Sequence, residues 1–264
     1  TPNLTLLAEN LYYQNKFKEA KKIFDSLKKI GEVYSWYAAK NLAAISLQDK
    51  TKSYAIKFLK KEFNSLSSPT YMHYYELANF YKANEYHNES IKYYSLALKK
   101  IKRSNPLVPK ILDRRGVSYE QIGDWDNAEK DLLESIEILP DQALVLNYLA
   151  YSWIEKKINK DKALLMLKKA TKLKEDNGYI IDSLGWAYYV NENYLDAEKY
   201  LKVAVQLMPL DPVINDHYGD TLWMLNKNIQ ARYFWNYASN LEGTTKELKD
   251  KISKKLIFGI KENL

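Results

Sequence analysis

The residues best able to do chemistry in this sequence are three histidines and several pairs of carboxylates, and cysteine is absent. His73, His87 and His217 lie on three separate predicted helices, so we do not expect them to converge on one metal ion. Asp216 and Asp220 are one helical turn apart, but carboxylate pairs on a helix face are usually solvated, and no neighbour that would tune a general acid is evident. The eight glycines are scattered, so no phosphate-cradling loop is expected. We therefore expect no enzyme, no bound metal and no cofactor.

The helices that would position these side chains follow a repeating pattern of small and bulky residues. The clearest copy runs from Gly178 to Pro209 and reads GYIIDSLGWAYYVNENYLDAEKYLKVAVQLMP. The spacing of a tetratricopeptide repeat is met by Leu184, Gly185, Tyr188, Ala197, Leu201, Ala204 and Pro209. Two helices can pack this closely only where a glycine or alanine on one meets an alanine on the other. The segment therefore resembles one complete tetratricopeptide repeat, a helix–turn–helix unit.

The same template fits seven times along the chain. The units begin near Thr1, Trp36, Tyr71, Pro109, Ala143, Gly178 and Pro212. The first two fit most loosely, and the fourth has Arg115 and Ser135 in place of the usual leucine and alanine. We predict an all-α fold, a right-handed α-solenoid of about seven such repeats that forms one domain over residues 1–264.

Residues 244–264 are predicted to form a helix that caps the last repeat. Gly243 is expected to end the preceding helix, and Thr244 and Glu247 have the spacing of a capping box. One apolar stripe contains Leu248, Ile252, Leu256 and Ile260. A terminal repeat needs a cover with a polar outer side. We therefore expect four lysines to face solvent, namely Lys249, Lys251, Lys254 and Lys255. A basic helix lying on anionic lipid is the alternative, but packing already accounts for the stripe.

Charge is distributed unevenly along the chain. The net formal charge is +7, and lysines recur as pairs on predicted outer helix faces, which is typical of solvated surfaces. Between Glu175 and Met224, however, there are nine acidic residues and two lysines, a net of −7 that leaves +14 for the rest. No apolar run approaches the length of about 18 residues that would suggest a membrane span. We expect different partners, or different parts of one partner, at the two ends.

The first helix of each repeat lines the concave face of such a solenoid, and core packing does not require large aromatic residues there. We expect this face to bind a peptide or protein through Tyr148, Tyr151, Asp182, Trp186, Tyr189, Asp216, Asp220 and Trp223. Aromatic rings interspersed with carboxylates suit a peptide with apolar and basic side chains. The alternative is that these rings only stack on each other or on a neighbouring array.

A second candidate surface is basic. Lys110 and Arg114 lie on the first helix of the fourth repeat, and Lys40 lies two repeats earlier. In chaperone-binding members of this superfamily, basic residues at these repeat positions clamp the carboxylate of a peptide C-terminus. Ala44 and Glu76 stand where that clamp has asparagines, and Glu76 would repel a carboxylate. We therefore expect no working clamp, and interpret these residues as a solvated face or part of a salt-bridge ladder.

RNA binding is the alternative function, because helical-hairpin repeats of similar length can read one base each. Such readers carry a recurring pair of polar residues at fixed repeat positions, whereas these positions vary here. The acidic stretch over the best-formed repeats would also repel phosphate. We therefore favour a protein partner and expect no nucleic acid.

The run from Asn147 to Ala238 is more specific than a generic repeat. It contains NYLAYSW, DNGYIIDSLGWAYY, AEKYLKVAVQLMPLDPVINDHYGDTLW and ARYFWNYA. This resembles the C-terminal block of a large group of bacterial tetratricopeptide proteins, some of which are envelope lipoproteins. One type in that group is an outer-membrane adaptor that binds and activates a carboxyl-terminal processing protease. The resemblance implies a scaffold or adaptor whose partner is a protease or the substrates of one.

The resemblance also implies a location in the bacterial cell envelope, in the periplasm or at the outer membrane. No lipobox cysteine is present, so an anchor would have to lie before Thr1, where further repeats could also stand. A cytoplasmic location is the alternative, because a chain without cysteine suits either compartment. A homo-oligomer formed through the ends of the solenoid is a further expectation to test.

Overall fold

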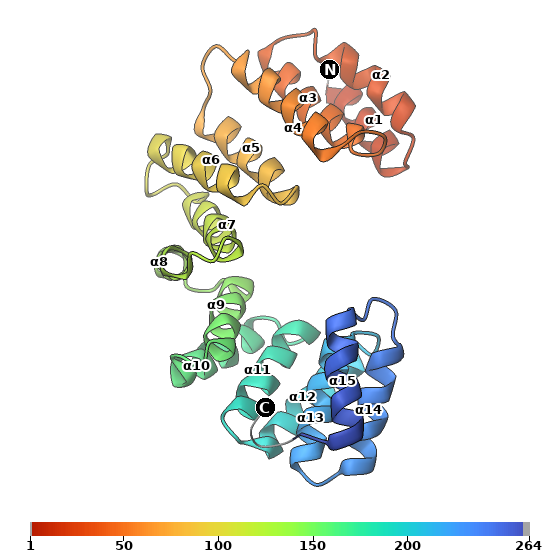
Figure 1. Cartoon of the computed structure of the whole chain (residues 1–264). Helices are drawn as coiled ribbons and strands as arrows, with labels where there is room; N and C mark the ends of the chain where they lie inside the picture. Colours follow the sequence, from red (N-terminus) through yellow and green to blue (C-terminus); the bar gives the residue numbers. More distant parts are fainter. Residues whose placement is uncertain (1, 261–264) are drawn as a thin grey trace. The chain divides into compact units, whose positions relative to one another are not determined.

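A computed structural model describes residues 2–260 of the chain. These residues form fifteen α-helices and no strand (Figure 1). The helices are α1 (Pro2–Tyr13), α2 (Phe17–Leu27), α3 (Glu32–Ser46), α4 (Lys52–Asn64), α5 (Tyr71–Ala83), α6 (His87–Lys100), α7 (Val108–Gln121), α8 (Trp125–Ile138), α9 (Ala143–Glu155), α10 (Lys160–Leu173), α11 (Gly178–Val190), α12 (Tyr194–Leu207), α13 (Pro212–Met224), α14 (Asn228–Asn240) and α15 (Lys246–Phe258). The predicted all-α fold of paired helices is confirmed.

The chain divides into two compact units, residues 1–135 (unit 1) and residues 136–264 (unit 2). Within unit 2, α9 packs on α10, α11 on α12, and α13 on α14. Each first helix also packs on the second helix of the preceding pair, as α11 does on α10 and α13 on α12. Unit 1 repeats this arrangement from α1 to α7. The expectation of one continuous domain stays a prediction.

Small residues set the distance between the two helices of a repeat. A Cβ atom added to Gly185 on α11 would lie 2.6 Å from Cγ of Leu201 on α12. At the equivalent place in the next repeat, a Cβ on Gly219 would lie 2.5 Å from Cδ1 of Trp235. Leu201 and Trp235 are fully buried. The glycines are therefore required by close approach of the partner helix, as the repeat signature predicts.

The fourth repeat departs from the signature and compensates with polar contacts. The Arg115 guanidinium donates two hydrogen bonds to Asp131, at 2.6 and 2.7 Å, and a third to Ser95 Oγ at 2.9 Å. Ser135 Oγ donates to the backbone oxygen of Pro109 at 2.9 Å. The arginine that replaces leucine is thus paired on both sides of its guanidinium, as a half-buried charge requires.

The start of α13 follows the prediction, and the start of α3 does not. Asp211 accepts hydrogen bonds from the amides of Val213 and Ile214, and Pro212 occupies the first turn. Helix α3 begins at Glu32, one turn before the predicted Trp36. The added turn places the Glu32 carboxylate at the positive end of the helix dipole.

Helix α15 begins one repeat period after α13 and packs on α14 as each first helix packs on the preceding second helix. It therefore takes the place of the first helix of an eighth repeat. Of its predicted stripe, Ile252 is fully buried and Leu248 and Leu256 are half-buried, whereas Ile260 lies beyond the end of the helix at Phe258. Lys249, Lys251 and Lys254 are exposed. The predicted cap is wrong, because Thr245 accepts from the amide of Leu248, whereas the Thr244 hydroxyl donates to backbone oxygens of α14 and the following turn.

Within residues 2–260, no helix combines the length and the apolar character needed to cross a membrane.

Candidate partner-binding face

Three first helices of unit 2 approach one another directly. Helix α9 contacts α11, and α11 contacts α13, in addition to the contacts each makes with second helices. Because the first helices meet in this way, the surface they share is the inner side of the stack. We call this surface the inner face and define it by Tyr148, Tyr151, Glu155, Trp186 and Tyr189, which lie on α9 and α11.

An aromatic stack joins α11 to α13 at this face. The Trp186 ring lies 4.6 Å from the Tyr189 ring at 8°, and 4.0 Å from the His217 ring at 11°. Trp186 Nε1 donates to Oε1 of Glu155 on α9 at 2.8 Å. Trp186 and Tyr189 are half-buried, so each keeps some ring surface open to solvent. One tryptophan therefore touches residues of all three first helices, and part of the aromatic character of the face holds the repeats together.

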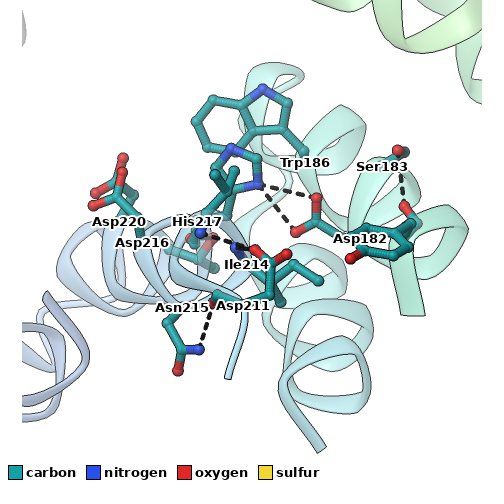
Figure 2. Close-up of polar contacts among 12 residues, drawn as sticks. Asp182, Ser183, Trp186, Asp211, Ile214, Asn215, Asp216, His217 and Asp220 are labelled. Atoms are coloured by element: carbon teal, nitrogen blue, oxygen red, sulfur yellow. Dashed lines mark hydrogen bonds and ion pairs between the residues drawn. The ribbon is translucent and has the colours of Figure 1, made fainter. Parts of the chain in front are cut away.

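Beneath the stack, His217 forms a buried ion pair with Asp182, as Figure 2 shows. His217 donates from Nδ1 to the two Asp182 oxygens at 3.0 and 3.2 Å. Burial alone would lower the pKa of His217, but Asp182, Asp216 and Asp220 together outweigh it and raise that pKa above its usual value. The charged imidazolium is thus the form that suits this site.

His217 and His73 are expected to have pKa values on opposite sides of the usual histidine value. His217 should remain protonated above pH 6.5, whereas partial burial lowers the pKa of His73. Because a raised histidine pKa stabilises the fold below the unfolded value and that stability is lost as pH rises through the folded value, a His217→Gln variant should lose most at pH 6 and least at pH 9. Imidazole chemical shifts followed by NMR across pH 4–9 measure both pKa values. A His217 pKa below that of His73 would contradict the assignment.

The second buried cluster joins α13 to α15. Lys255 Nζ lies 2.8 Å from Asp216 Oδ2 and 2.7 Å from Asp220 Oδ1. Trp235 Nε1 on α14 donates to the same Asp220 oxygen at 2.8 Å. Burial and the neighbouring Asp216 raise the pKa of Asp220 to about 6 against the opposing effect of Lys255. The cluster therefore connects α15 to α13, the first helix of the seventh repeat.

Trp223 lies at the end of this cluster, beneath the residue that follows α15. Its ring contacts Gly259 so closely that no Cβ could be added there, and Gly259 has a φ of +70°. The Trp235 ring lies 5.4 Å away, and the guanidinium of Arg232 lies over the Trp223 ring at 5.4 Å. Trp223, which was expected to bind a partner, therefore packs within the chain against the residue that follows α15.

These positions correct the sequence analysis at several residues. Asp182, Asp216 and Asp220 were expected on the exposed side of their helices, yet each is at most 7% exposed and is held by a cation of the next helix pair. Lys255 was expected to face solvent and is turned inward onto the two aspartates. Tyr148, Tyr151, Trp186 and Tyr189 stay half-buried on the inner face, as expected.

Comparison with known proteins gives partial matches. No family model matches the chain. A TPR repeat-containing protein of Pseudomonas aeruginosa is 36% identical over 110 residues, which are 42% of this chain and 18% of that protein. The UDP-N-acetylglucosamine–peptide N-acetylglucosaminyltransferase of Giardia intestinalis is 27% identical over 227 residues, 81% of this chain and 13% of that enzyme. The crystal structure of a tetratricopeptide repeat protein from Parabacteroides merdae matches with a TM-score of 0.68 and 18% identity, covering 85% of this chain and 88% of that one.

The chain is built of tetratricopeptide repeats. It spans less than a fifth of the length of either curated relative. Tetratricopeptide repeats are generally modules for protein–protein interaction and typically carry no catalytic residues. Within the described residues, no group of three histidine, aspartate or glutamate side chains could hold a metal ion.

Two of the three residues of the second candidate surface, Lys40 and Arg114, have partners within this tetratricopeptide array. Lys40 pairs with Glu76, which also accepts from Trp36 Nε1 at 2.6 Å. Arg114 donates to Asn79, and Lys110 is exposed. Glu76 forms an ion pair with Lys40 and, being negative, would repel an incoming carboxylate. The three basic side chains therefore do not form a joint anion site.

Four of the polar pairs between neighbouring repeats share one spacing, which could have been read from the sequence. Asp182 and His217 are 35 positions apart, as are Asp220 and Lys255. Lys40 and Glu76 are 36 apart, and Asn79 and Arg114 are 35 apart. Complementary side chains one tetratricopeptide repeat apart therefore mark pairs between neighbouring repeats. Searching for that spacing would have identified His217 and Lys255 as paired residues, although it would not have found Glu155.

Proposed function

We propose that the chain is a non-enzymatic scaffold that binds a protein or peptide partner on the inner face of unit 2. The observation that carries this proposal is the set of half-buried rings on that face, Tyr151, Trp186 and Tyr189, which remain partly open to solvent. Large rings that combine an apolar body with a polar tip are well suited to protein interfaces. The general role of tetratricopeptide repeats as interaction modules supports the same conclusion.

The partner segment suited to this face is apolar with a basic side chain. The three carboxylates first expected to attract a cation already form ion pairs with His217 and Lys255. Glu155 is exposed at the edge of the ring cluster, beside the Trp186 indole that donates to it. A lysine or arginine placed there would gain a charge-assisted contact while its neighbours cover the rings.

A narrower role is that of an adaptor in the bacterial cell envelope for a carboxyl-terminal processing protease, with an anchor before Thr1. This role is supported by the block from Asn147 to Ala238 and by the similarity to a Pseudomonas aeruginosa TPR repeat-containing protein. It is part of the proposal and is tested separately from the scaffold role. An RNA partner is disfavoured, because the exposed charge on the inner face is that of Glu155.

The scaffold role is tested by selecting peptides from a random display library on the purified chain. We expect the selected peptides to combine apolar and basic residues, and to bind a Tyr151→Ser, Glu155→Lys variant at least about tenfold more weakly. The matched control is Tyr233→Ser, which removes an exposed ring from α14. Unchanged binding to the inner-face variant, with thermal unfolding confirming that it is folded, would contradict the proposal.

Two further measurements separate the alternatives. Analytical ultracentrifugation with the carboxyl-terminal processing protease of the same bacterium should show a complex that the inner-face variant weakens. No complex would remove the adaptor role and leave the scaffold role to the peptide experiment. Single-stranded RNA of mixed sequence should not bind at physiological salt, and tight binding there would favour the RNA alternative.

A further inference from the structure

Exposed apolar side chains gather at the turns between successive repeats of unit 2. Seven large apolar residues in three turns or in the helix ends beside them are exposed by at least 42%, and Leu210 by 70%. They are Leu139, Leu144, Leu173, Tyr179, Leu207, Leu210 and Val213. Contiguous exposed apolar surface on a folded protein often marks an interaction site.

The three turns lie at one end of the helix stack. Each connects the second helix of a pair to the first helix of the next pair, and successive helices alternate in direction. Leu144, Tyr179 and Val213 are each the second residue of their helix, α9, α11 and α13. They therefore occupy equivalent places one repeat apart. We call this row of seven residues the loop edge, and it shares no residue with the inner face.

The spacing of the row matches the rise of an α-helix. First helices that contact each other, as α9, α11 and α13 do, have axes about 8–10 Å apart. An α-helix advances about 10.5 Å in seven residues. A helix lying across the three turns would therefore present one apolar side chain to each repeat if its apolar residues recur every seventh position.

The charge of the three turns indicates which residues should lie beside the apolar positions of such a helix. The three turns contain Asp141, Glu175, Asp176 and Asp211 and a single lysine, Lys174. Asp141 pairs with Lys169, and Asp211 caps α13. Glu175 and Asp176 are exposed and form no ion pair within the described part of the chain. A basic flank would complement these two carboxylates, whereas an anionic lipid surface would be repelled.

We propose that the loop edge is a second docking surface, which takes an amphipathic helix of a partner protein with apolar residues at every seventh position and lysine or arginine beside them. The first two turns each contribute two of the seven apolar residues, and the third contributes three. Glu175 and Asp176 orient the helix by contacting its basic side. The site is independent of the inner face, so one partner could occupy both or two partners could bind together.

The test uses a fluorescent synthetic helix of about three heptads, with leucine at every seventh position and lysine beside it, and a peptide of the same composition in scrambled order. Fluorescence anisotropy should show binding of the ordered peptide and at least about tenfold weaker binding of the scrambled one. A Tyr179→Ser, Leu210→Ser variant should lose at least about tenfold in affinity. The matched control, Leu195→Ser, Ile229→Ser, removes two exposed apolar residues from the opposite ends of the helices and should bind as the wild type does.

Charge reversal and the inner-face variant complete the experiment. Glu175→Lys, Asp176→Lys should weaken binding of the ordered peptide, and Tyr151→Ser, Glu155→Lys should not, which separates this site from the proposed function. Equal binding of both peptides, or equal losses in the loop-edge and control variants, would overturn the proposal. The proposal would also be overturned if the peptide fails to bind and the Tyr179→Ser, Leu210→Ser variant instead abolishes dimers of the chain. The same holds if that variant abolishes binding to vesicles that contain one quarter phosphatidylglycerol.

Discussion

Replacing Lys255 with alanine is expected to lower the free energy of unfolding of unit 2 by about 3–5 kcal/mol. The substitution leaves Asp216 and Asp220 buried side by side without their cation. A buried charge without a partner costs more than the pair contributes, since neither carboxylate can recover its hydration. The loss should be smaller at pH 5 than at pH 8, because Asp220 has a pKa of about 6 even beside Lys255 and takes up a proton below it.

Urea denaturation and hydrogen exchange measure this effect. Exchange should increase first in α15, which Lys255 connects to α13. Lys254→Ala is the matched control, because Lys254 precedes Lys255 and is exposed. Adding Asp216→Asn and Asp220→Asn to the Lys255→Ala variant should restore part of the stability by removing the unpaired charge. If Lys254→Ala and Lys255→Ala have the same effect, the cluster does not hold α15.

Replacing Gly219 with valine is expected to cost about 3 kcal/mol. A Cβ at this position would lie 2.5 Å from Cδ1 and 2.7 Å from Nε1 of Trp235. The indole cannot turn away freely, because it is fully buried and donates its N–H to Asp220. Relief of the clash therefore requires α13 and α14 to separate, which also loosens the Asp220 contact.

Ser253→Val gives a close control for this substitution. Ser253 occupies the same place in α15 that Gly219 occupies in α13, one repeat period later, and it is exposed. Valine there should change stability by less than about 0.5 kcal/mol, because serine and valine have similar helix propensities. Both variants are compared by urea denaturation and by near-ultraviolet circular dichroism of the tryptophans. Equal stability of the two variants would show that Gly219 is not required by close packing.

The sequence predicts the repeat architecture well because small residues at fixed spacings have one dominant structural meaning. Gly185 and Gly219 meet buried partners as expected, and the apolar stripe of α15 packs inward. Helix ends are less certain, as the early start of α3 and the cap at Thr245 show. An end depends on one or two local hydrogen bonds, whereas the repeat register is fixed by many packed residues.

The candidate site could be predicted only in part. The sequence analysis named the aromatic residues of the inner face. The three carboxylates that it expected to bind a partner, however, already form ion pairs within the chain. Their exposure depends on which side chain of the next repeat reaches them, and a helix-face assignment within one repeat does not contain that information. Arg115 shows the same limit, since its partner Asp131 becomes evident only when both helices are placed.

The one-repeat spacing of the polar pairs also concerns the order of the repeats. Apolar stacking alone would let any repeat follow any other, because the small residues and leucines are nearly the same in each. The pairs are specific: Asp182 requires a cation on the repeat after it, and Asp216 with Asp220 requires one on α15. No repeat in unit 2 contains both partners of these pairs. These pairs therefore help to specify the order in which the repeats stack.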